Sequence, residues 1–195
     1  FAPYFDIKGY EEYPARATGN DCFVATPSVN DWYETVKLNY GVFYQSGGEK
    51  QFDPIPDTWH KMLHILLFWA GKQVDGFRCD MAEMVPREFW AWAIEQVKKE
   101  YPNILFIAEV YNPNLYRDYL AAGFDYLYDK VGMYDYLRGV TSKNWAAEGI
   151  TMQWQSVDDI RDRMLYFLEN HDEQRIASGF FCGRGICAEP AMIVA

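Results

Sequence analysis

The sequence has little positive charge, and this shortage argues against one class of function. It contains 18 lysine and arginine residues against 28 aspartate and glutamate residues, so its net charge is -10 at pH 7. Because proteins gain affinity for nucleic acid by presenting cations to phosphate, unaided nucleic-acid binding is not expected. The sequence also lacks an apolar run of the roughly 18 residues that a membrane span needs, and its N-terminus lacks the plan of a signal peptide. No membrane span is expected, and localisation is left open.

Cysteine is scarce, and its spacing predicts neither a metal site nor a disulfide framework. No two of the cysteines form the C-x-x-C pair that structural zinc sites commonly use. The four cysteines are Cys22, Cys79, Cys182 and Cys187. Half of the residues are hydrophobic, and 18% are aromatic. This composition is typical of an ordinary globular protein rather than a disordered chain.

Two segments carry apolar residues at helical spacing. Residues 57–71 place apolar side chains on one face, with Asp57 as the predicted N-cap and Gly71 as the stop. Residues 86–100 begin with a proline, which favours the first turn of a helix. They carry one apolar stripe, made of Phe89, Trp90, Ala93, Ile94 and Val97. Both segments are predicted helices, and a shorter helix is expected over residues 114–122.

Four short apolar runs are predicted to be buried strands. They cover residues 74–79, 104–110, 124–128 and 164–170. Ser156 and Asp159 resemble a capping box and predict that a further helix begins behind Ser156. Residues 1–56, in contrast, are rich in Gly, Pro, Asn, Asp and Tyr and show no sustained period. They are predicted to form an irregular excursion.

Alternating helices and nearly continuous apolar strands predict an α/β fold with a parallel sheet. A doubly wound sheet and a barrel both satisfy this pattern. No G-x-G-x-x-G or Walker sequence follows a strand, which disfavours the phosphate-binding sites of doubly wound sheets. A complete TIM barrel uses about 250 residues for eight units, and only about four strands are predicted here. We therefore expect a partial TIM barrel, about strands four to seven, preceded by an irregular insert.

Acidic residues lie where the predicted strands end, namely Asp80, Glu109 and Asp172. Each has a simpler explanation when taken alone, because strand ends are polar. Asp80 could neutralise Arg78, and Asp172 could cap a helix. In a TIM barrel, however, functional side chains gather at the carboxyl ends of the strands. Three acids that recur at this end of successive strands indicate one common pocket.

Converging carboxylates suit the cleavage of a glycosidic bond, in which one acid protonates the leaving oxygen and another attacks or stabilises an oxocarbenium-like carbon. Arg78 and Asp80 are two positions apart and share one face of a strand. The arginine is expected to keep Asp80 ionised, as a nucleophile requires. Glu109 follows the run "LFIA", and this apolar setting is expected to raise its pKa and keep it protonated, as a general acid requires.

Three segments resemble sequence signatures of the α-amylase family of retaining glycoside hydrolases. They are "DGFRCD" at 75–80, "FIAEV" at 106–110 and "FLENHD" at 167–172, in the order of that family. The segment "DWYETVKLNY" at 31–40 is similar to the one that precedes the family's fourth barrel strand. The resemblance implies a TIM barrel in which residues 1–56 are an insert after strand three and residues 57–195 are the central βα units.

The same resemblance implies a role for each residue of the candidate site. Asp80 would be the nucleophile, Glu109 the acid and base, and Asp172 the stabiliser of the transition state. Arg78 would orient the nucleophile. His171 would hydrogen-bond the sugar in the cleavage subsite.

Other residues are expected at the margins of this site. Tyr111 directly follows the strand of the acid and is predicted to offer a flat face to a sugar ring. His60 and His64 are four positions apart, but Lys61 stands where a zincin motif needs glutamate, so exposed helix histidines are expected. No cofactor is expected for the chemistry. A structural calcium ion is compatible with the Asp and Asn residues of the insert, but its ligands are unassigned.

The sequence departs from the family pattern in two places. The early signature, an aspartate followed by Asn-His at the end of strand three, is absent, and so are strands one to three and eight. The chain is therefore expected to begin inside the insert and to stop before barrel closure. Many members also have Lys-His after the nucleophile, where this chain has Glu83 and Met84. The subsites on the leaving-group side are therefore unassigned.

The predicted function is cleavage of α-1,4-glucosidic bonds in starch-like α-glucans or maltooligosaccharides by a retaining double displacement. One alternative is an α-glucan transglycosylase, which passes the glycosyl group to a sugar rather than to water. Another is a non-catalytic family member that acts in binding. The sequence does not separate hydrolysis from transfer, whereas the presence of all three carboxylates argues against the non-catalytic alternative.

Overall fold

The computed structural model describes most of the chain, including two of the four cysteines. The described residues are 18–24, 26–32, 34–44, 47–181, 191, 192 and 194. Cys22 and Cys79 are free thiols, whereas Cys182 and Cys187 lie outside the described residues. Burial raises the pKa of the Cys79 thiol to about 12, so this side chain is an unreactive part of the core.

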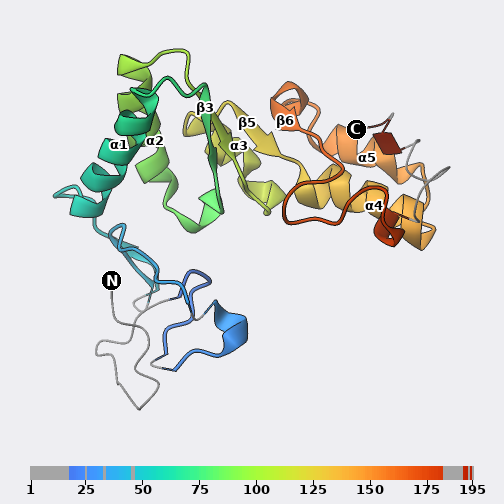
Figure 1. The fold of residues 1–195 in the computed structure, drawn as a ribbon, viewed down its shortest axis with the longest axis horizontal. Helices are drawn as coiled ribbons and strands as arrows, with labels where there is room; N and C mark the ends of the chain where they lie inside the picture. The colour runs from blue at the N-terminus through green and yellow to red at the C-terminus, as the bar shows by residue number, and fades with distance from the viewer. Residues whose placement is uncertain are drawn as a thin grey trace.

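Four parallel strands form one sheet and follow one another in chain order (Figure 1). They are β3 (Gly76–Cys79), β4 (Leu105–Ala108), β5 (Tyr126–Tyr128) and β6 (Met164–Leu165). A doubly wound sheet reverses its strand order at a switch point, whereas a barrel adds each new strand on the same side. The uninterrupted order confirms an α/β fold of the partial TIM barrel type. The described strands form an open sheet, not a closed barrel.

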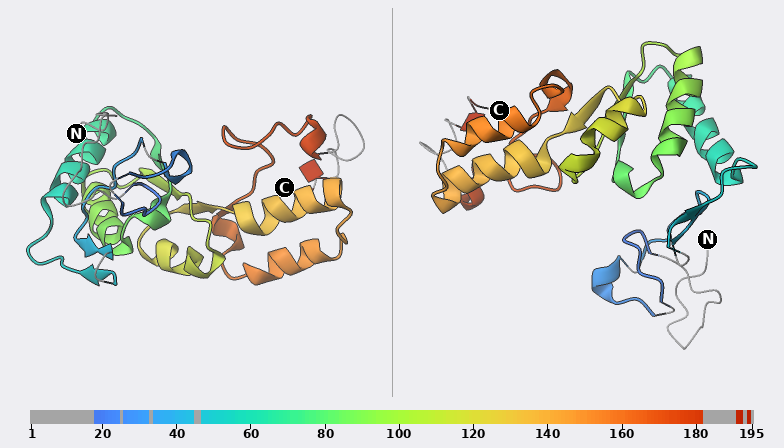
Figure 2. Two further views of the ribbon diagram at one scale, coloured as in Figure 1. Left: turned by 90° about the horizontal axis from the view of Figure 1, so that it is seen from below. Right: turned by 180° about the vertical axis from the view of Figure 1, so that it is seen from behind.

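Helices pack at both ends of this sheet (Figure 2). At one end lie α1 (Asp57–Ala70) and α2 (Arg87–Glu100), and at the other lie α4 (Asp135–Lys143) and α5 (Gly149–Ser156). The predicted apolar stripe of α2 is confirmed, because all five of its members are buried. None of the described helices is long and apolar enough to cross a membrane.

Short helical turns connect these elements. The 3-10 turns are η1 (Val29–Asp31), η3 (Ala82–Met84), η4 (Pro113–Leu115), η6 (Arg161–Arg163) and η7 (Gly179–Phe181). One turn, η5 (Lys130–Tyr134), is a π-helix. The helix expected over residues 114–122 is confirmed as α3 (Tyr116–Ala121), which directly follows η4. The structure therefore alternates helices and strands as the sequence predicts.

The first turn of α1 differs slightly from the prediction. Pro56 is the N-cap, and Asp57 is the first helical residue. The carboxylate of Asp57 lies 2.6 Å from the ammonium group of Lys61, one helical turn later. An acid in this turn still complements the helix dipole, which explains why the sequence pattern marks the correct end of the helix. Gly71 ends α1 as predicted.

The segment before β6 contradicts the predicted helix start. Ser156 is the last residue of α5, and its hydroxyl donates a hydrogen bond to the carbonyl of Gln153 at 2.7 Å. The carboxylate of Asp159 instead accepts a hydrogen bond from Arg117 at 2.9 Å. Both members of the predicted capping box thus have other partners. The strand predicted over 164–170 is also too long, because only its first two residues pair with β5.

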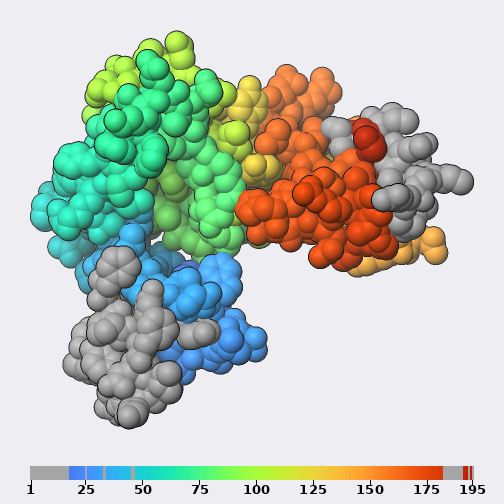
Figure 3. All heavy atoms as spheres, viewed as in Figure 1, coloured from blue at the N-terminus to red at the C-terminus, as the bar shows by residue number. Residues whose placement is uncertain are grey.

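The described residues before α1 form a mostly irregular projection, blue in Figure 3. Its only regular pairing within the described part is the hairpin of β1 (Val42–Phe43) and β2 (Glu49–Lys50). Ring packing of Tyr40 on Phe89 and of Phe52 on Trp59 joins it to the helices, and so do polar contacts. The indole N–H of Trp59 donates to the carbonyl of Tyr40 at 3.0 Å, and Lys50 lies 2.6 Å from Glu88.

Candidate active site

The carboxyl ends of β3 and β4 meet at one edge of the sheet and present two of the predicted acids. The two strands pair in register over four residue pairs, the last of which joins Cys79 to Ala108. Asp80 and Glu109 are the next residues of their segments. Parallel pairing therefore brings these two predicted residues side by side.

Arg78 of β3 lies among all three predicted acids. One terminal nitrogen of its guanidinium hydrogen-bonds Asp80, and the other lies 2.8 Å from Glu109 and 3.9 Å from Asp172. Burial lowers the pKa of Arg78, but the hydrogen bond to Asp80 and the charge of Glu109 raise it by more. The group therefore stays cationic. One cation thus gathers carboxylates that are far apart in the sequence.

Glu109 is buried in polar surroundings, so the predicted apolar setting is wrong. Its carboxylate accepts a hydrogen bond from the backbone N–H of Met81 at 2.8 Å and another from the hydroxyl of Tyr111 at 2.9 Å. The side chain is only 4% exposed. The apolar run before Glu109 forms β4, while the donors come from the segment after β3 and from Tyr111. The sequence around Glu109 does not show that the N–H of a distant residue, Met81, hydrogen-bonds its carboxylate.

The chain after β3 bends around Glu109. Met81 adopts a left-handed conformation, with φ 41° and ψ 46°, which residues other than glycine rarely adopt. The bend directs the N–H of Met81 at the carboxylate, and the N–H of Ala82 donates to the main-chain carbonyl of Glu109 at 2.9 Å. Such strain costs about 1 to 3 kcal/mol and clusters at functional sites. Here the strained bend at Met81 holds Glu109 in place through these two N–H groups.

Tyr111 reaches the site through its hydroxyl group. Burial, the hydrogen bond to Glu109 and the charge of Asp172 all raise the pKa of this phenol. Tyr111 therefore keeps its proton and acts as a donor to Glu109. The prediction that its ring contacts a sugar stays a prediction.

Asp172 and His171 lie on the loop that follows β6. Both side chains are exposed, and the Nε2 atom of His171 lies 3.1 Å from the Asp172 carboxylate. The side chain of Asn170 accepts hydrogen bonds from the N–H groups of Asp172 and Glu173, both at 2.9 Å. This turn brings Asp172 within 3.9 Å of Arg78. All six predicted site residues are thus connected through contacts around Arg78.

Sequence reasoning missed two acids on the other side of this loop, the partly buried Glu173 and the buried Asp129. Glu173 lies 3.0 Å from Lys130 and accepts a hydrogen bond from Tyr134 at 2.8 Å. Asp129 is 1% exposed and directly follows β5, as two of the predicted acids follow their strands. The strand-end rule could therefore have identified Asp129. No local pattern marks Glu173, because its partners lie in a distant segment.

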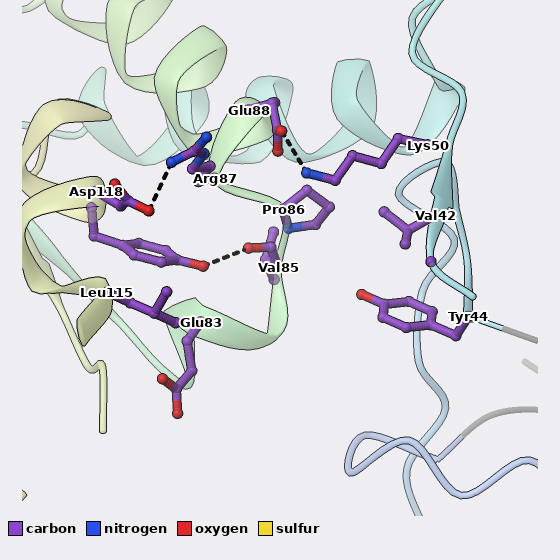
Figure 4. Close-up of a pocket in the computed structure, with 12 residues that line it drawn as sticks. Val42, Tyr44, Lys50, Glu83, Val85, Pro86, Arg87, Glu88, Leu115 and Asp118 are labelled. Carbon is purple, nitrogen blue, oxygen red and sulfur yellow. Dashed lines mark hydrogen bonds and ion pairs between the residues drawn. The ribbon is translucent and has the colours of Figure 1, made fainter. Parts of the chain in front are cut away.

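A separate cavity of about 430 Å³ lies between the β1–β2 hairpin and the loops after β3 and β4 (Figure 4). Four of its charged residues form two pairs, Lys50 with Glu88 at 2.6 Å and Arg87 with Asp118 at 2.8 Å. Glu83 also lines it and lies on the loop that carries Asp80. The cavity therefore borders that loop but does not contain the predicted catalytic acids.

The arrangement can support nucleophilic and acid–base chemistry at one carbon centre. Asp80 is an exposed carboxylate, as attack on a substrate requires, whereas Glu109 is buried and hydrogen-bonded. Their different environments suit different roles. Within the described part of the chain, no group of three or more His, Cys, Asp or Glu side chains is arranged to hold a metal ion.

The chain is similar in sequence to maltosyltransferases. It is 41% identical over 69 residues to alpha-1,4-glucan:maltose-1-phosphate maltosyltransferase from Mycolicibacterium smegmatis, a match that covers 35% of this chain and 10% of that protein. It is 29% identical over 97 residues to the enzyme of the same name from Cereibacter sphaeroides, a match that covers 46% of this chain and 16% of that protein. The chain thus matches only a small part of these relatives. No family profile matches it.

Solved structures of α-amylases share the fold. An α-amylase from Lactobacillus plantarum matches with a TM-score of 0.59 and 28% identity, over 77% of this chain and 36% of that chain. An Anoxybacillus α-amylase matches with a TM-score of 0.56 and 22% identity, over 66% of this chain and 29% of that chain. The second likeness concerns the fold alone.

Proposed function

We propose that this chain, which is related to the catalytic region of α-amylase family enzymes, is part of an enzyme that cleaves α-1,4-glucosidic bonds in starch-like α-glucans or maltooligosaccharides. The observation that carries the proposal is the contact of one guanidinium, that of Arg78, with the carboxylates of both Asp80 and Glu109. Retaining glycosidases need two carboxyl groups about 5 to 5.5 Å apart. Because Asp80 and Glu109 contact the same guanidinium, their carboxyl groups lie near each other, which supports such a spacing.

The proposed reaction has two displacements. Asp80 attacks the anomeric carbon while Glu109 gives its proton to the departing oxygen, and the glycosidic bond breaks. An acceptor hydroxyl then attacks the same carbon, Glu109 takes its proton, and Asp80 is released. Asp172 stabilises the positive charge of both transition states, and His171 hydrogen-bonds the sugar. The contact between Glu109 and Arg78 must loosen when Glu109 takes its proton. These steps need no cofactor.

The acceptor decides between hydrolysis and transfer. Water gives hydrolysis, and the likeness to the α-amylase from Lactobacillus plantarum supports this first candidate. A sugar hydroxyl gives transfer, and the names of the matched maltosyltransferases support this second candidate. Product analysis of the enzyme that contains this chain separates the two. Maltoheptaose alone should give only shorter products in hydrolysis. Maltose 1-phosphate with maltoheptaose should give longer products and free phosphate in maltosyl transfer.

The roles of Asp80 and Glu109 can be separated by the leaving group. Glu109→Gln should cripple cleavage of starch but spare attack on an activated aryl glycoside, whose leaving group needs no proton. A covalent intermediate should then accumulate and be visible by mass spectrometry. Asp80→Asn should abolish both reactions. Asp118→Asn, an exposed acid paired with Arg87, is the matched control and should leave both unchanged. If the Asp80 variant alone kept activity on the aryl glycoside, the two roles would have to be exchanged.

A further inference from the structure

Asp172 is held less directly than the other two predicted catalytic acids. It lies on the loop after β6, beyond the two residue pairs that join β6 to β5. Its side chain is 53% exposed, and its side-chain neighbours at the site are His171 at 3.1 Å and Arg78 at 3.9 Å. Exposed ion pairs contribute little to stability. These contacts alone do not explain how the loop is fixed.

The next residue, Glu173, has its side chain packed into the protein. The side chain is 15% exposed, and one carboxylate oxygen lies 3.0 Å from the ammonium group of Lys130. The other oxygen accepts a hydrogen bond from the hydroxyl of Tyr134 at 2.8 Å. Burial and this hydrogen bond raise the pKa of Tyr134, so its hydroxyl keeps the proton that it donates. Arg138 is a third partner, 3.9 Å from the oxygen that Tyr134 contacts, so Glu173 is held from several sides in an environment with little solvent.

Two of these partners belong to a well-packed turn. Lys130 and Tyr134 are the first and last residues of η5, the π-helix that follows β5. Asp129 accepts a hydrogen bond from the N–H of Gly132 at 3.1 Å through its side chain and one from Tyr134 at 3.1 Å through its carbonyl. The buried ring of Tyr134 stacks on Phe167, with ring centroids 4.9 Å apart. The turn is thus a firm support for the loop.

We infer that Glu173 is a positioning residue that anchors the loop after β6 to the turn after β5 and so sets the place of Asp172 beside Arg78. The inference rests on the proposed function, in which Asp172 stabilises charge in the transition state. Because the two residues are adjacent, a shift of the Glu173 side chain moves the main chain that carries Asp172. The turn after β5 thus contributes to catalysis indirectly, because it holds Glu173 and so positions Asp172 on the loop after β6.

Kinetics of the enzyme that contains this chain test this role through a double-mutant cycle. Glu173→Gln keeps the shape of the side chain and an acceptor for Tyr134 but loses the charge that faces Lys130. It should lower kcat about tenfold to a hundredfold, with KM changed less than about twofold, because small displacements of catalytic groups have effects of this size. In an Asp172→Asn background, the same substitution should change the residual kcat less than about twofold, since Glu173 acts through Asp172. Tyr134→Phe, which removes one hydrogen bond, should show the same pattern more weakly and replaces Glu173→Gln if that variant does not fold.

The matched control for the cycle is Asp159→Asn, which breaks a pair with Arg117 away from the site. It should leave kcat unchanged in both backgrounds. An equal loss of kcat from Glu173→Gln in both backgrounds would show a merely structural role and overturn the inference, and so would an unchanged kcat. Full activity of Asp172→Asn alone would instead overturn the proposed role of Asp172.

Hydrogen exchange measured by mass spectrometry tests the anchor without any activity assay. Glu173→Gln should speed exchange in a peptide covering residues 166–176, where Asn170 accepts the N–H groups of Asp172 and Glu173. Exchange in β3 and β4 should not change, and Asp159→Asn should leave the loop unchanged. Exchange in the loop that is the same in Glu173→Gln and in the parent enzyme would contradict the anchoring step, whatever the role of Asp172.

Discussion

The two halves of the candidate site hold their carboxylates by different means. At the ends of β3 and β4, Asp80 and Glu109 directly follow strands that pair over four residue pairs, and backbone N–H groups bind Glu109. At the end of β6, the pairing covers two residue pairs, and Asp172 follows on a loop. The first half is placed by the main chain, and the second depends on side chains such as Glu173. Substitutions should therefore act differently in the two halves.

The largest effect on stability is expected from Arg78→Ala. It leaves the carboxylate of Glu109, which is 4% exposed, without its cation. Removing one partner of a buried pair costs about 3 to 5 kcal/mol, and because a quarter of the Arg78 side chain is exposed, we expect the lower end of this range. Urea unfolding measures the loss. A loss below about 1 kcal/mol, typical of exposed pairs, would show that the N–H of Met81 and the hydroxyl of Tyr111 fix Glu109 without Arg78.

A smaller loss of stability is expected from Gly132→Ala in the turn after β5. An added Cβ would overlap a carboxylate oxygen of Asp129, so the turn would have to shift. Overpacking of this kind costs about 1 to 3 kcal/mol. Gly179→Ala is the matched control, because a Cβ there meets nothing within 4 Å. Thermal unfolding should separate the two variants, and equal melting temperatures would mean that the turn is too pliable to support Glu173.

The same contrast explains which parts of the site could be predicted from the sequence. The acids at strand ends could be predicted because they follow the ends of apolar runs. The apolar stripe of α2 could be predicted because its residues recur at helical spacing. The polar setting of Glu109 could not be predicted, because its donors come from Met81 and Tyr111 and not from the run before it. Glu173 was missed for a similar reason, since Lys130 lies in another βα unit.

The errors in the fold have a physical cause of the same kind. Ser156 and Asp159 have the spacing of a capping box, but the contact of Asp159 with Arg117 forms only when the turn after α5 lies against α3. The strand over 164–170 is apolar along much of its length, yet pairing stops after two residues, and Phe167 stacks on Tyr134 of η5. A local sequence pattern indicates which residues are buried. It does not indicate which distant segment supplies their hydrogen-bonding or strand-pairing partner.

A moderate effect that depends on pH is expected from Asp129→Asn. Burial raises the pKa of the Asp129 carboxyl above its ordinary 3.8, although hydrogen bonds from the backbone N–H groups of Met133 and Gly132 oppose the rise. A raised pKa in the folded state gives stability that is present below pH 3.8 and is lost as the pH rises through the folded pKa. The variant avoids this loss. Its stability relative to the parent protein should therefore grow with pH. The total gain should be about 1.4 kcal/mol for each unit by which folding raises the pKa of Asp129.

Urea unfolding at several pH values from 4 to 7 measures this difference. Asp159→Asn is the control of opposite sign, because the hydrogen bond from Arg117 lowers the pKa of Asp159. Its stabilising contribution is present above pH 3.8 and is lost only as the pH falls through the folded pKa, so from pH 4 to 7 that variant should keep a nearly constant difference from the parent protein. A difference between Asp129→Asn and the parent that stays constant with pH would mean that burial does not govern the titration of Asp129.

The smallest effect is expected from Arg175→Ala, which tests whether the loop after β6 is held by its own exposed pair. Arg175 lies 2.7 Å from Glu169, but its side chain is 77% exposed, so the pair should contribute nothing measurable to stability. The pKa of Glu169 is lowered first by a hydrogen bond from the N–H of Ile176 and only then by Arg175, which indicates that the backbone contact matters more. Urea unfolding and hydrogen exchange of residues 166–176 should both match the parent protein. If Arg175→Ala instead speeded exchange as much as Glu173→Gln, the loop would carry its own support, and the contrast between the two halves would rest on this exposed pair rather than on the turn after β5.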